Sequence, residues 1–566
     1  MKQIDPKDLE LAFVPPEVPR FAELIDKLPR EDELSATRRR DMVSGLRRVA
    51  KALGRPPEDV PCDTRWLQPR LARISPAALG LSPKSWQNAL SDARAALVHF
   101  GLAARRTNRA EELSPAWRVL WTAILRSNDR TLQPALCRFV HFLDRHGIEP
   151  GEVTEAHAIA YRDAVALNEI SKSPDVAYRA AVNGWNLAAR RIDGWPDVTL
   201  ALPSRQKRII RPIETFPESF AQDLDRLIAA LGTPDPFAEG GRRKSLRQAT
   251  RAQYRRQLHR FASELVEAGM DIDEITGIDV LLEPAVAERG LRQMLGRAGN
   301  ETTRAIADMA GLLRNLARTE GRTAEAQETL ALLAQRLALP AQTGMTRKNR
   351  ERLRVLQDVK QQRKLLCLPD QLFASAGAAP KAFTQGLMRE DALAIALLLA
   401  CPVRIKNVAS IHLEENLHLP GDGRAYLVFE DEETKTSRPI EFELPQDILR
   451  MIDRHLATRS PALCPPGTPW LFPRRDGRAA VDPQQLSGRI SRRIRRETGL
   501  EMNAHLFRHF AVMIWLDANP GAYEAARRLL GHSEVSHTIN MYSGLEGTSA
   551  IREFAELLAT RKAGVA

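Results

Sequence analysis

Four side chains near the C-terminus of this 566-residue chain are suited to acting together on a phosphate group. His505 and Arg508 are three positions apart, which places them on one face if that segment is a helix. A later helical run stops at Gly531, a residue type common in the left-handed turn that ends a helix, so His532 should lie at a helix end. Tyr542 follows ten positions later. Two imidazoles, a guanidinium and a phenol suit the binding of a phosphate oxyanion and a covalent attack on it.

Other side chains in this stretch are weaker candidates. Tyr523 lies before the second histidine, in a helical run rich in Ala and Arg, so it is not expected to be a nucleophile. His509 is expected to point to another face of its helix and to pack in the core, and His537 is expected to face the solvent. His505 and His532 could instead be helix-terminal capping or core histidines, and Tyr542 could be a packing aromatic residue.

The length and composition of the chain describe a folded protein of several domains with an excess of basic residues. The chain is too long for one ordinary core, and 43% hydrophobic with 27% charged residues is a globular composition. Lys and Arg number 83 against 71 acidic residues, giving a net charge of +12 and a pI of about 9.7. This excess favours a polyanionic partner, with nucleic acid ahead of anionic lipid. A merely basic soluble enzyme is the alternative on charge alone.

Cysteine usage and the N-terminus indicate an intracellular protein. The five cysteines are scattered without a Cys-x-x-Cys pair, so we expect neither a disulfide framework nor a zinc site, and no cofactor. The first residues lack the apolar core of a signal peptide. The longest apolar run, Ala392–Val403, is too short to span a bilayer, so no membrane partner is expected.

A weak internal repeat becomes visible when Gly54, Gly147 and Gly269 are superposed. Apolar residues recur eleven, eight and four positions before each glycine, which is the spacing of one helix face. An acid and a branched aliphatic residue follow five and six positions after it, and a second helical run comes later. Chance likeness between helix pairs and a solenoid are the alternatives. We expect three tandem all-α modules, at 1–110, 115–200 and 240–340.

The remaining sequence predicts a basic linker and a C-terminal domain that, unlike the all-α modules before it, contains strands. The linker, 341–365, carries eight Lys or Arg and two acids up to Lys364. In the domain that follows, 366–566, two short strands at Ala425–Glu430 and Pro439–Leu444 should form a β-hairpin. Helices are expected elsewhere in it, at Gln446–Arg459, Pro483–Thr498, Ala504–Asp517 and Gly521–Leu530. The fold class is therefore mainly α with a small β-hairpin or sheet in the C-terminal domain.

The C-terminal domain resembles the tyrosine recombinase (phage integrase) family. In that family an arginine follows a buried helix, and then come a hairpin lysine, a His-x-x-Arg helix, a further histidine and a tyrosine. Counterparts stand here in that order, at Arg404, Lys435, His505, Arg508, His532 and Tyr542. The resemblance covers about 366–545 and implies the tyrosine recombinase catalytic fold, preceded by tandem SAM-like, core-binding type modules. The third module is the one that resembles the family's DNA-clamping domain.

Three local features depart from the family pattern, and one is the gap from His532 to Tyr542, which is one residue longer than the commonest family spacing. The family commonly has an acid three residues after the first arginine, where this chain has Asn407. The acidic run Glu430–Glu433 directly precedes Lys435, which is an awkward neighbour for a DNA backbone, and Arg438 is the nearby substitute cation.

The resemblance implies DNA strand exchange by transesterification without ATP or a metal. Tyr542 would attack the scissile phosphate to give a 3′-phosphotyrosyl bond. Arg404 and Arg508 would hold the non-bridging oxygens, and His532 would donate a hydrogen bond to the phosphate. Lys435 would protonate the departing 5′-oxygen, and His505 would assist proton movement at the tyrosine.

The expected protein is thus a bacterial, nucleoid-associated cytoplasmic recombinase serving a mobile genetic element. It would bind double-stranded DNA and act as a homo-tetramer in the synaptic complex, with a complex shared with related recombinases as the alternative. The alternatives are a DNA-binding accessory protein that kept the fold but lost efficient chemistry, and a type IB topoisomerase-like relaxing enzyme.

Overall fold

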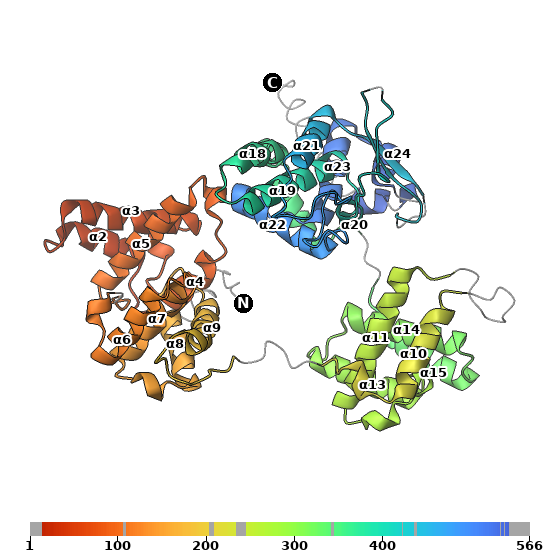
Figure 1. The fold of residues 1–566 in the computed structure, drawn as a ribbon, viewed down its shortest axis with the longest axis horizontal. Coiled ribbons are helices and arrows are strands. Elements are labelled where there is room, and N and C mark those ends of the chain that lie inside the picture. Colours follow the sequence, from red (N-terminus) through yellow and green to blue (C-terminus); the bar gives the residue numbers. More distant parts are fainter. Residues whose placement is uncertain are drawn as a thin grey trace, which may run out of the picture. The chain divides into compact units, whose positions relative to one another are not determined.

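The computed structural model describes residues 14–105, 109–202, 209–233, 245–340, 344–421, 423–434, 438–531, 534–536 and 538–542. The chain divides into two compact units, Pro203–Gln342 and the remainder, Met1–Leu202 with Thr343–Ala566. The described residues form four hydrophobic cores, one in each of three helical regions and one in the C-terminal part (Figure 1). The predicted fold class, mainly α with one small sheet, is confirmed. The domain boundaries given above stay a prediction.

The first helical region is built around two long helices, α3 and α5, which pack against each other. Gly45 of α3 allows a close approach to α5, because a Cβ there would lie 2.7 Å from the Ala93 nitrogen. Its elements are α2 (Phe21–Lys27), η1 (Leu28–Arg30), α3 (Ala36–Ala52), η2 (Pro57–Asp59), α4 (Thr64–Leu71), η3 (Pro76–Leu79) and α5 (Pro83–His99).

The second helical region has an aromatic core. Trp117, Trp185 and Trp195 contact one another edge to face, with ring centroids 5.1 to 6.5 Å apart. Its elements are η4 (Ala110–Glu112), α6 (Pro115–Arg126), α7 (Leu132–Arg145), η5 (Pro150–Glu152), α8 (Glu155–Asn168) and α9 (Pro174–Arg191).

The first two helical regions are joined by polar contacts at the C-terminal end of α8. The hydroxyl of Thr64 donates to the Leu167 carbonyl at 2.5 Å, and the Gln68 amide donates to the Glu169 carbonyl at 2.9 Å. Arg94 forms a buried ion pair with the Glu169 carboxylate at 3.5 Å. These side chains satisfy carbonyl groups that the helix end leaves without partners.

The third helical region is the separate compact unit. Its elements are η6 (Ile213–Thr215), α10 (Glu218–Ala230), α11 (Gln248–Glu267), η7 (Ile272–Glu274), α12 (Ile278–Leu281), α13 (Pro284–Arg297), α14 (Arg304–Thr319) and α15 (Ala324–Arg336).

The order of elements predicted from the three glycines is present in all three regions. Gly54, Gly147 and Gly269 have φ values of +67°, +66° and +86°, which end α3, α7 and α11 in the left-handed conformation that glycine adopts most readily. A short 3₁₀ turn and further helices follow each glycine.

The C-terminal core surrounds α19, whose residues 390–398 are buried. It packs against α18, α21, α22 and α23. The helices of this core are α16 (Arg347–Val355), α17 (Val359–Leu366), α18 (Leu368–Ser375), η8 (Ala376–Ala378), α19 (Ala382–Ala400), α20 (Ile405–Ala409), α21 (Gln446–Ala457), α22 (Pro483–Thr498), α23 (Ala504–Ala518) and α24 (Tyr523–Leu530).

A three-stranded antiparallel sheet covers one part of this core. The predicted hairpin is present as β2 (Tyr426–Phe429) and β3 (Ile440–Glu443), with Tyr426 opposite Glu443. A third strand, β1 (Leu417–His418), pairs with β2 and was not predicted because it has only two residues.

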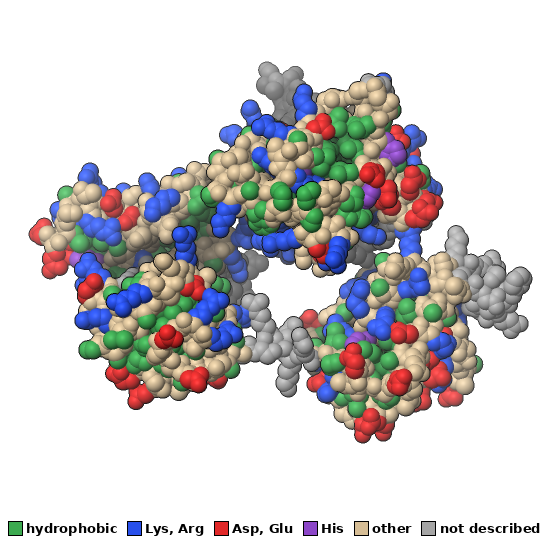
Figure 2. Space-filling view, viewed as in Figure 1, with side chains coloured by type: hydrophobic (Ala, Val, Ile, Leu, Met, Phe, Trp, Pro, Cys, Tyr) green, Lys and Arg blue, Asp and Glu red, His purple; other side chains and the backbone are tan. Residues whose placement is uncertain are grey.

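The basic segment before the C-terminal domain is helical and packs on that domain's core. Leu353, Leu356 and Leu365, from α16 and α17 and the turn between them, are buried in the same cluster as α19. The exposed faces of both helices carry the arginines and lysines. On the face shown in Figure 2, basic side chains are spread over all parts of the chain. Within the described ranges, no helix is long and apolar enough to cross a membrane.

Candidate active site

Helix α23 begins where its sequence predicts and carries three of the residues of interest. The Asn503 side chain accepts a hydrogen bond from the Leu506 backbone nitrogen at 2.9 Å, which satisfies one of the unpaired N–H groups at the helix start. His505, Arg508 and His509 then follow within the first two turns.

Arg508 is buried and is held by two main-chain carbonyls. Its Nη1 donates to the Pro402 oxygen at 2.6 Å and its Nη2 donates to the Leu530 oxygen at 2.7 Å. Leu530 is the last residue of α24, so its carbonyl is one that the helix leaves unpaired. Arg508 thereby connects two parts of the chain. One is Pro402, two residues before Arg404, and the other is the C-terminal end of α24, directly before Gly531.

Arg404 is the half-buried N-cap residue of α20 and lies close enough to Arg508 for their charges to interact. Burial lowers the pKa of Arg508 to about 10, with a further contribution from the Arg404 charge, which Tyr542 partly offsets. Burial also lowers the pKa of Arg404. Among the described residues, no carboxylate forms an ion pair with either arginine, and the Arg404 side chain has no hydrogen-bond partner. Two partly desolvated cations without a counter-charge favour a bound anion.

His505 stands beside these arginines with part of its ring exposed. The surrounding protein removes water from the imidazole and lowers its pKa below 6.5, and the charges of Arg508 and Arg404 lower it further. Because its pKa is below 6.5, His505 is neutral at pH 7 and can accept a proton.

Tyr542 is buried, and its hydroxyl lies 2.9 Å from Nδ1 of His509. Which of the two atoms donates depends on the histidine tautomer. Burial raises the pKa of the Tyr542 phenol, while the Arg508 charge acts in the opposite direction. The His505 ring stands edge-on to the His509 ring, with centroids 4.8 Å apart.

The expectation that His509 points to a different face from the other candidates was wrong. His509 lies four residues after His505, so a helix places both on one side, and the structure brings both rings together beside Tyr542. The i, i+4 spacing was the signal in the sequence that would have identified His509.

The structure brings together Arg404, His505, Arg508 and Tyr542, and two predicted residues lie outside the part of the chain that it describes. These are Lys435 and His532. Gly531 ends α24 with a φ of +60°, so the helix end predicted before His532 is in place. His537 and residues 543–566 also lie outside the described residues.

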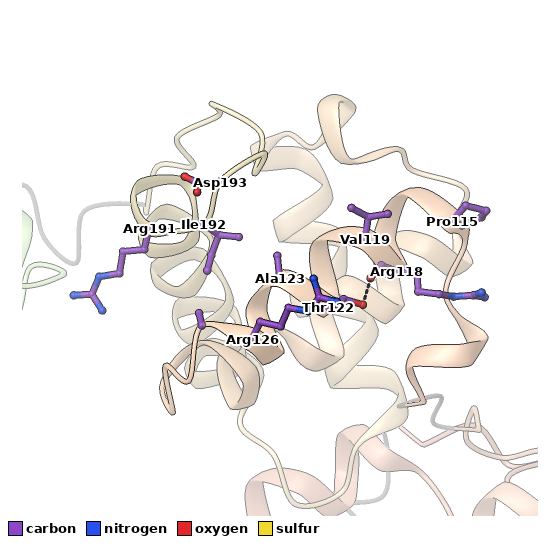
Figure 3. A pocket seen from close by; sticks show the side chains of 10 residues that line it. Pro115, Arg118, Val119, Thr122, Ala123, Arg126, Arg191, Ile192 and Asp193 are labelled. Atoms are coloured by element: carbon purple, nitrogen blue, oxygen red, sulfur yellow. Dashed lines mark hydrogen bonds between the residues drawn. The ribbon is translucent and has the colours of Figure 1, made fainter.

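A large open groove lies on the second helical region, not at these residues. It has a volume of about 800 Å³ and is lined by α6 and the end of α9, with Val119, Ala123 and Ile192 among its apolar residues (Figure 3). Arg118, Arg126 and Arg191 lie around it. None of the predicted site residues lines this groove.

The comparisons with known proteins bear on the C-terminal domain. Residues 377–546 match the model of the phage integrase family, a range that contains all six predicted site residues. No curated protein matches the chain in a sequence comparison.

Solved structures of recombinases are similar at low identity. XerA recombinase is 13% identical, with 57% of this chain and 92% of that chain covered and a TM-score of 0.23. XerH site-specific recombinase bound to difH substrate is 14% identical, with coverage of 59% and 95% and a TM-score of 0.30. The Tn1549 transposon integrase with circular intermediate DNA is 12% identical, with coverage of 56% and 93% and a TM-score of 0.32.

The family match confirms the resemblance seen in the sequence. The match of residues 377–546 to the phage integrase family supports a tyrosine recombinase.

Proposed function

We propose that this protein is a site-specific DNA recombinase that cuts and rejoins duplex DNA through a 3′-phosphotyrosyl intermediate. The observation that carries the proposal is the pair Arg404 and Arg508, two desolvated arginines without a carboxylate partner among the described residues, beside the buried hydroxyl of Tyr542. Such a site is suited to a phosphodiester, whose charge grows in the transition state of substitution at phosphorus.

In the proposed cleavage step, the Tyr542 oxygen forms a bond to phosphorus and the bond from phosphorus to the 5′-oxygen breaks. The tyrosine proton passes to a neutral imidazole, and His509 is the residue whose Nδ1 contacts the hydroxyl. His505 stands next to it and was the residue expected from the sequence. Lys435 donates the proton that the departing 5′-oxygen needs. The reverse reaction with a 5′-hydroxyl from another strand completes the exchange.

The arginines and His532 have binding roles in this scheme. Arg404 and Arg508 hold the non-bridging oxygens, and the two carbonyls on Arg508 fix its fork before DNA arrives. His532 donates a hydrogen bond to the phosphate. The covalent bond preserves the energy of the phosphodiester, so the scheme calls for neither ATP nor a metal.

A basic face on α3 supports DNA as the partner of the first helical region. An open groove of about 590 Å³ runs along this helix and is lined by five basic residues, Arg39, Arg40, Arg47, Arg48 and Lys51. Residues spaced by three, four and seven positions lie on one side of a helix, so these cations form a continuous stripe. Neutralisation of DNA phosphates by such a stripe gives binding that weakens as salt rises.

The assembly and the biological setting belong to the same proposal. A tetramer of this chain on two half-site pairs, in a bacterial cell and in the service of a mobile genetic element, follows from the family resemblance.

Strand transfer tests this function against its two alternatives. A suicide substrate, nicked near the cleavage position, should trap the protein covalently and then transfer the strand to a second duplex. Binding without covalent trapping would favour an accessory protein. Covalent trapping with relaxation of supercoiled DNA but without transfer to a second duplex would favour a type IB topoisomerase-like enzyme.

A further inference from the structure

A small cavity lies where the first two helical regions meet, and its lining is strongly basic. Its volume is about 90 Å³. The basic side chains in its lining come from both regions, Arg94 and Arg105 from the first and Arg138, His141 and Arg145 of α7 from the second. Among the described residues, Glu169 is the one carboxylate that lines it. Four guanidinium groups share this acid, so the cavity has an excess of positive charge.

Glu169 is buried and divides its charge between two of the arginines. Its Oε2 lies 3.5 Å from Nε of Arg94, and its Oε1 lies 3.6 Å from Nη1 of Arg138. Arg94 also donates to the Asn168 carbonyl at 3.1 Å and to the Ala104 carbonyl at 2.8 Å. Arg94 therefore has a structural role in joining the two regions, and Glu169 alone cannot neutralise the remaining cations.

Arg138 has the geometry of an anion-binding residue. Its Nη1 is buried and has no hydrogen-bond partner among the described residues. The Glu169 oxygen at 3.6 Å is beyond ordinary hydrogen-bond distance. A buried N–H of a cation without an acceptor costs free energy, which an oxyanion in the cavity would recover.

The volume and the polar groups of the cavity limit the class of ligand. Pockets for drug-sized ligands begin at roughly 300 Å³, so this cavity takes a much smaller group. Burial raises the pKa of the Tyr161 phenol to about 12, so this lining hydroxyl stays protonated and can donate a hydrogen bond. Planar guanidinium groups bind phosphate oxygens through paired hydrogen bonds. A single phosphate group therefore fits both the size and the charge.

We propose that this cavity binds one phosphate group, with Arg105 and Arg138 as its cationic partners and Tyr161 as a further donor. Two sources offer this chemistry, free phosphate in solution and a backbone phosphate of bound duplex DNA. Because the lining comes from both helical regions, the bound group stabilises the joint between them. The inference does not depend on the proposed cleavage reaction, since it concerns residues of the first two regions alone.

Hydrogen exchange of the α7 and α8 amide groups in the full chain tests the site. The probe is inorganic phosphate, added at constant ionic strength with chloride as the replaced anion. Phosphate should raise the protection of these helices in a saturable way, because a ligand that binds the folded state stabilises it. This local measurement is separate from any phosphate that binds at Arg404 and Arg508.

Arg138→Gln should need about tenfold more phosphate for the same protection, because it loses charged hydrogen bonds to the anion. Arg105→Gln should also weaken the response, and its exposed position guards against a folding defect in Arg138→Gln. Arg126→Gln is the matched control. It removes an exposed arginine of α6 that does not line this cavity, so it should respond to phosphate as wild type does.

A short DNA duplex of mixed sequence distinguishes the two sources of the phosphate group. If the ligand is a backbone phosphate, DNA alone should raise the protection of α7 and α8, and Arg138→Gln should reduce this increase. If it is free phosphate, DNA should leave the protection unchanged while inorganic phosphate raises it. No increase with either probe, or responses of Arg138→Gln and Arg105→Gln equal to wild type, would overturn the inference. An equal weakening in Arg126→Gln would also overturn it, because it would show a general effect of charge.

Discussion

Two pairs of arginines that are at least partly buried lie in the C-terminal core, and the groups that neutralise their charges differ. Arg489 and Arg493 of α22 contact the buried Asp391 of α19 at 2.5 and 2.9 Å, and Arg489 also contacts Glu390 at 2.7 Å. Arg404 and Arg508 have no such carboxylates among the described residues, and Arg508 is held by neutral carbonyls alone. The first pair joins two helices, whereas the second pair is left with positive charge for a ligand.

The presence or absence of a carboxylate partner distinguishes a structural arginine from a binding arginine in one core. Burial of a cation costs free energy, which a carboxylate or a bound anion can offset. Where the protein supplies the carboxylate, loss of the pair should reduce stability. Where it does not, loss of an arginine should reduce ligand chemistry and leave stability nearly unchanged.

The largest expected effect is on stability at the neutralised pair. Asp391→Asn should destabilise the core by about 3–5 kcal/mol, because it leaves two arginines without their shared counter-charge. Hydrogen exchange of the α19 amide groups in the full chain measures this locally. Arg404→Gln is the matched control in the other pair and should leave the protection of α19 unchanged or raised. Equal loss of protection in both variants would show that the two arginine pairs do not differ in their contribution to stability.

The next largest effect is on the rate of DNA cleavage, at Arg404 and Arg508, the pair without carboxylate partners. Arg508→Gln should slow single-turnover cleavage by about 10²–10³-fold, corresponding to roughly 3–4 kcal/mol of lost transition-state stabilisation. Glutamine can still donate to one of the two carbonyls, so DNA binding should persist. Cleavage within threefold of wild type would show that Arg508 is a structural residue like Arg493.

A smaller effect concerns His455, which lies near the neutralised pair. Its ring is fully buried, and neither nitrogen has a hydrogen-bond partner among the described residues. Burial lowers its pKa to about 3, and the charges of Arg459, Arg389 and Arg489 contribute. Below pH 6.5 the unfolded chain binds a proton that the folded chain does not, so stability falls as pH falls from 6.5 towards 3.

His455→Leu removes this acid sensitivity. The free energy of unfolding of the variant, relative to wild type, should rise by roughly 2 kcal/mol between pH 7 and pH 5. Calorimetric unfolding at both pH values measures the change. A difference that does not depend on pH would show that the His455 ring finds a proton partner in the folded protein.

Local sequence signals predicted the elements that carry the site. Helix α22 has the predicted bounds, because the Asp482 side chain caps its first turn at Gln484 and Gln485 and Gly499 ends it with a φ of +80°. The end of α24 at Gly531 was predicted for the same reason. These signals lie within a few residues of the feature that they specify.

The contacts that arrange the site could not be read in the same way. Arg508 is held by Pro402 and Leu530, which are 106 and 22 residues away in the chain, and their carbonyls carry no side-chain signal. The contact of His509 with Tyr542 joins residues 33 apart. Family resemblance supplied the identities of the site residues, but only the fold shows which groups hold them.

Recovery of covalent protein–DNA complexes from cells that express the full chain tests directly whether Tyr542 is the nucleophile. The attached DNA is sequenced, and the linked peptide is mapped. We expect enriched DNA joined to Tyr542, with no adduct from Tyr542→Phe, which should still bind DNA. An adduct at another residue, or DNA that is bound only without a covalent link, would contradict it.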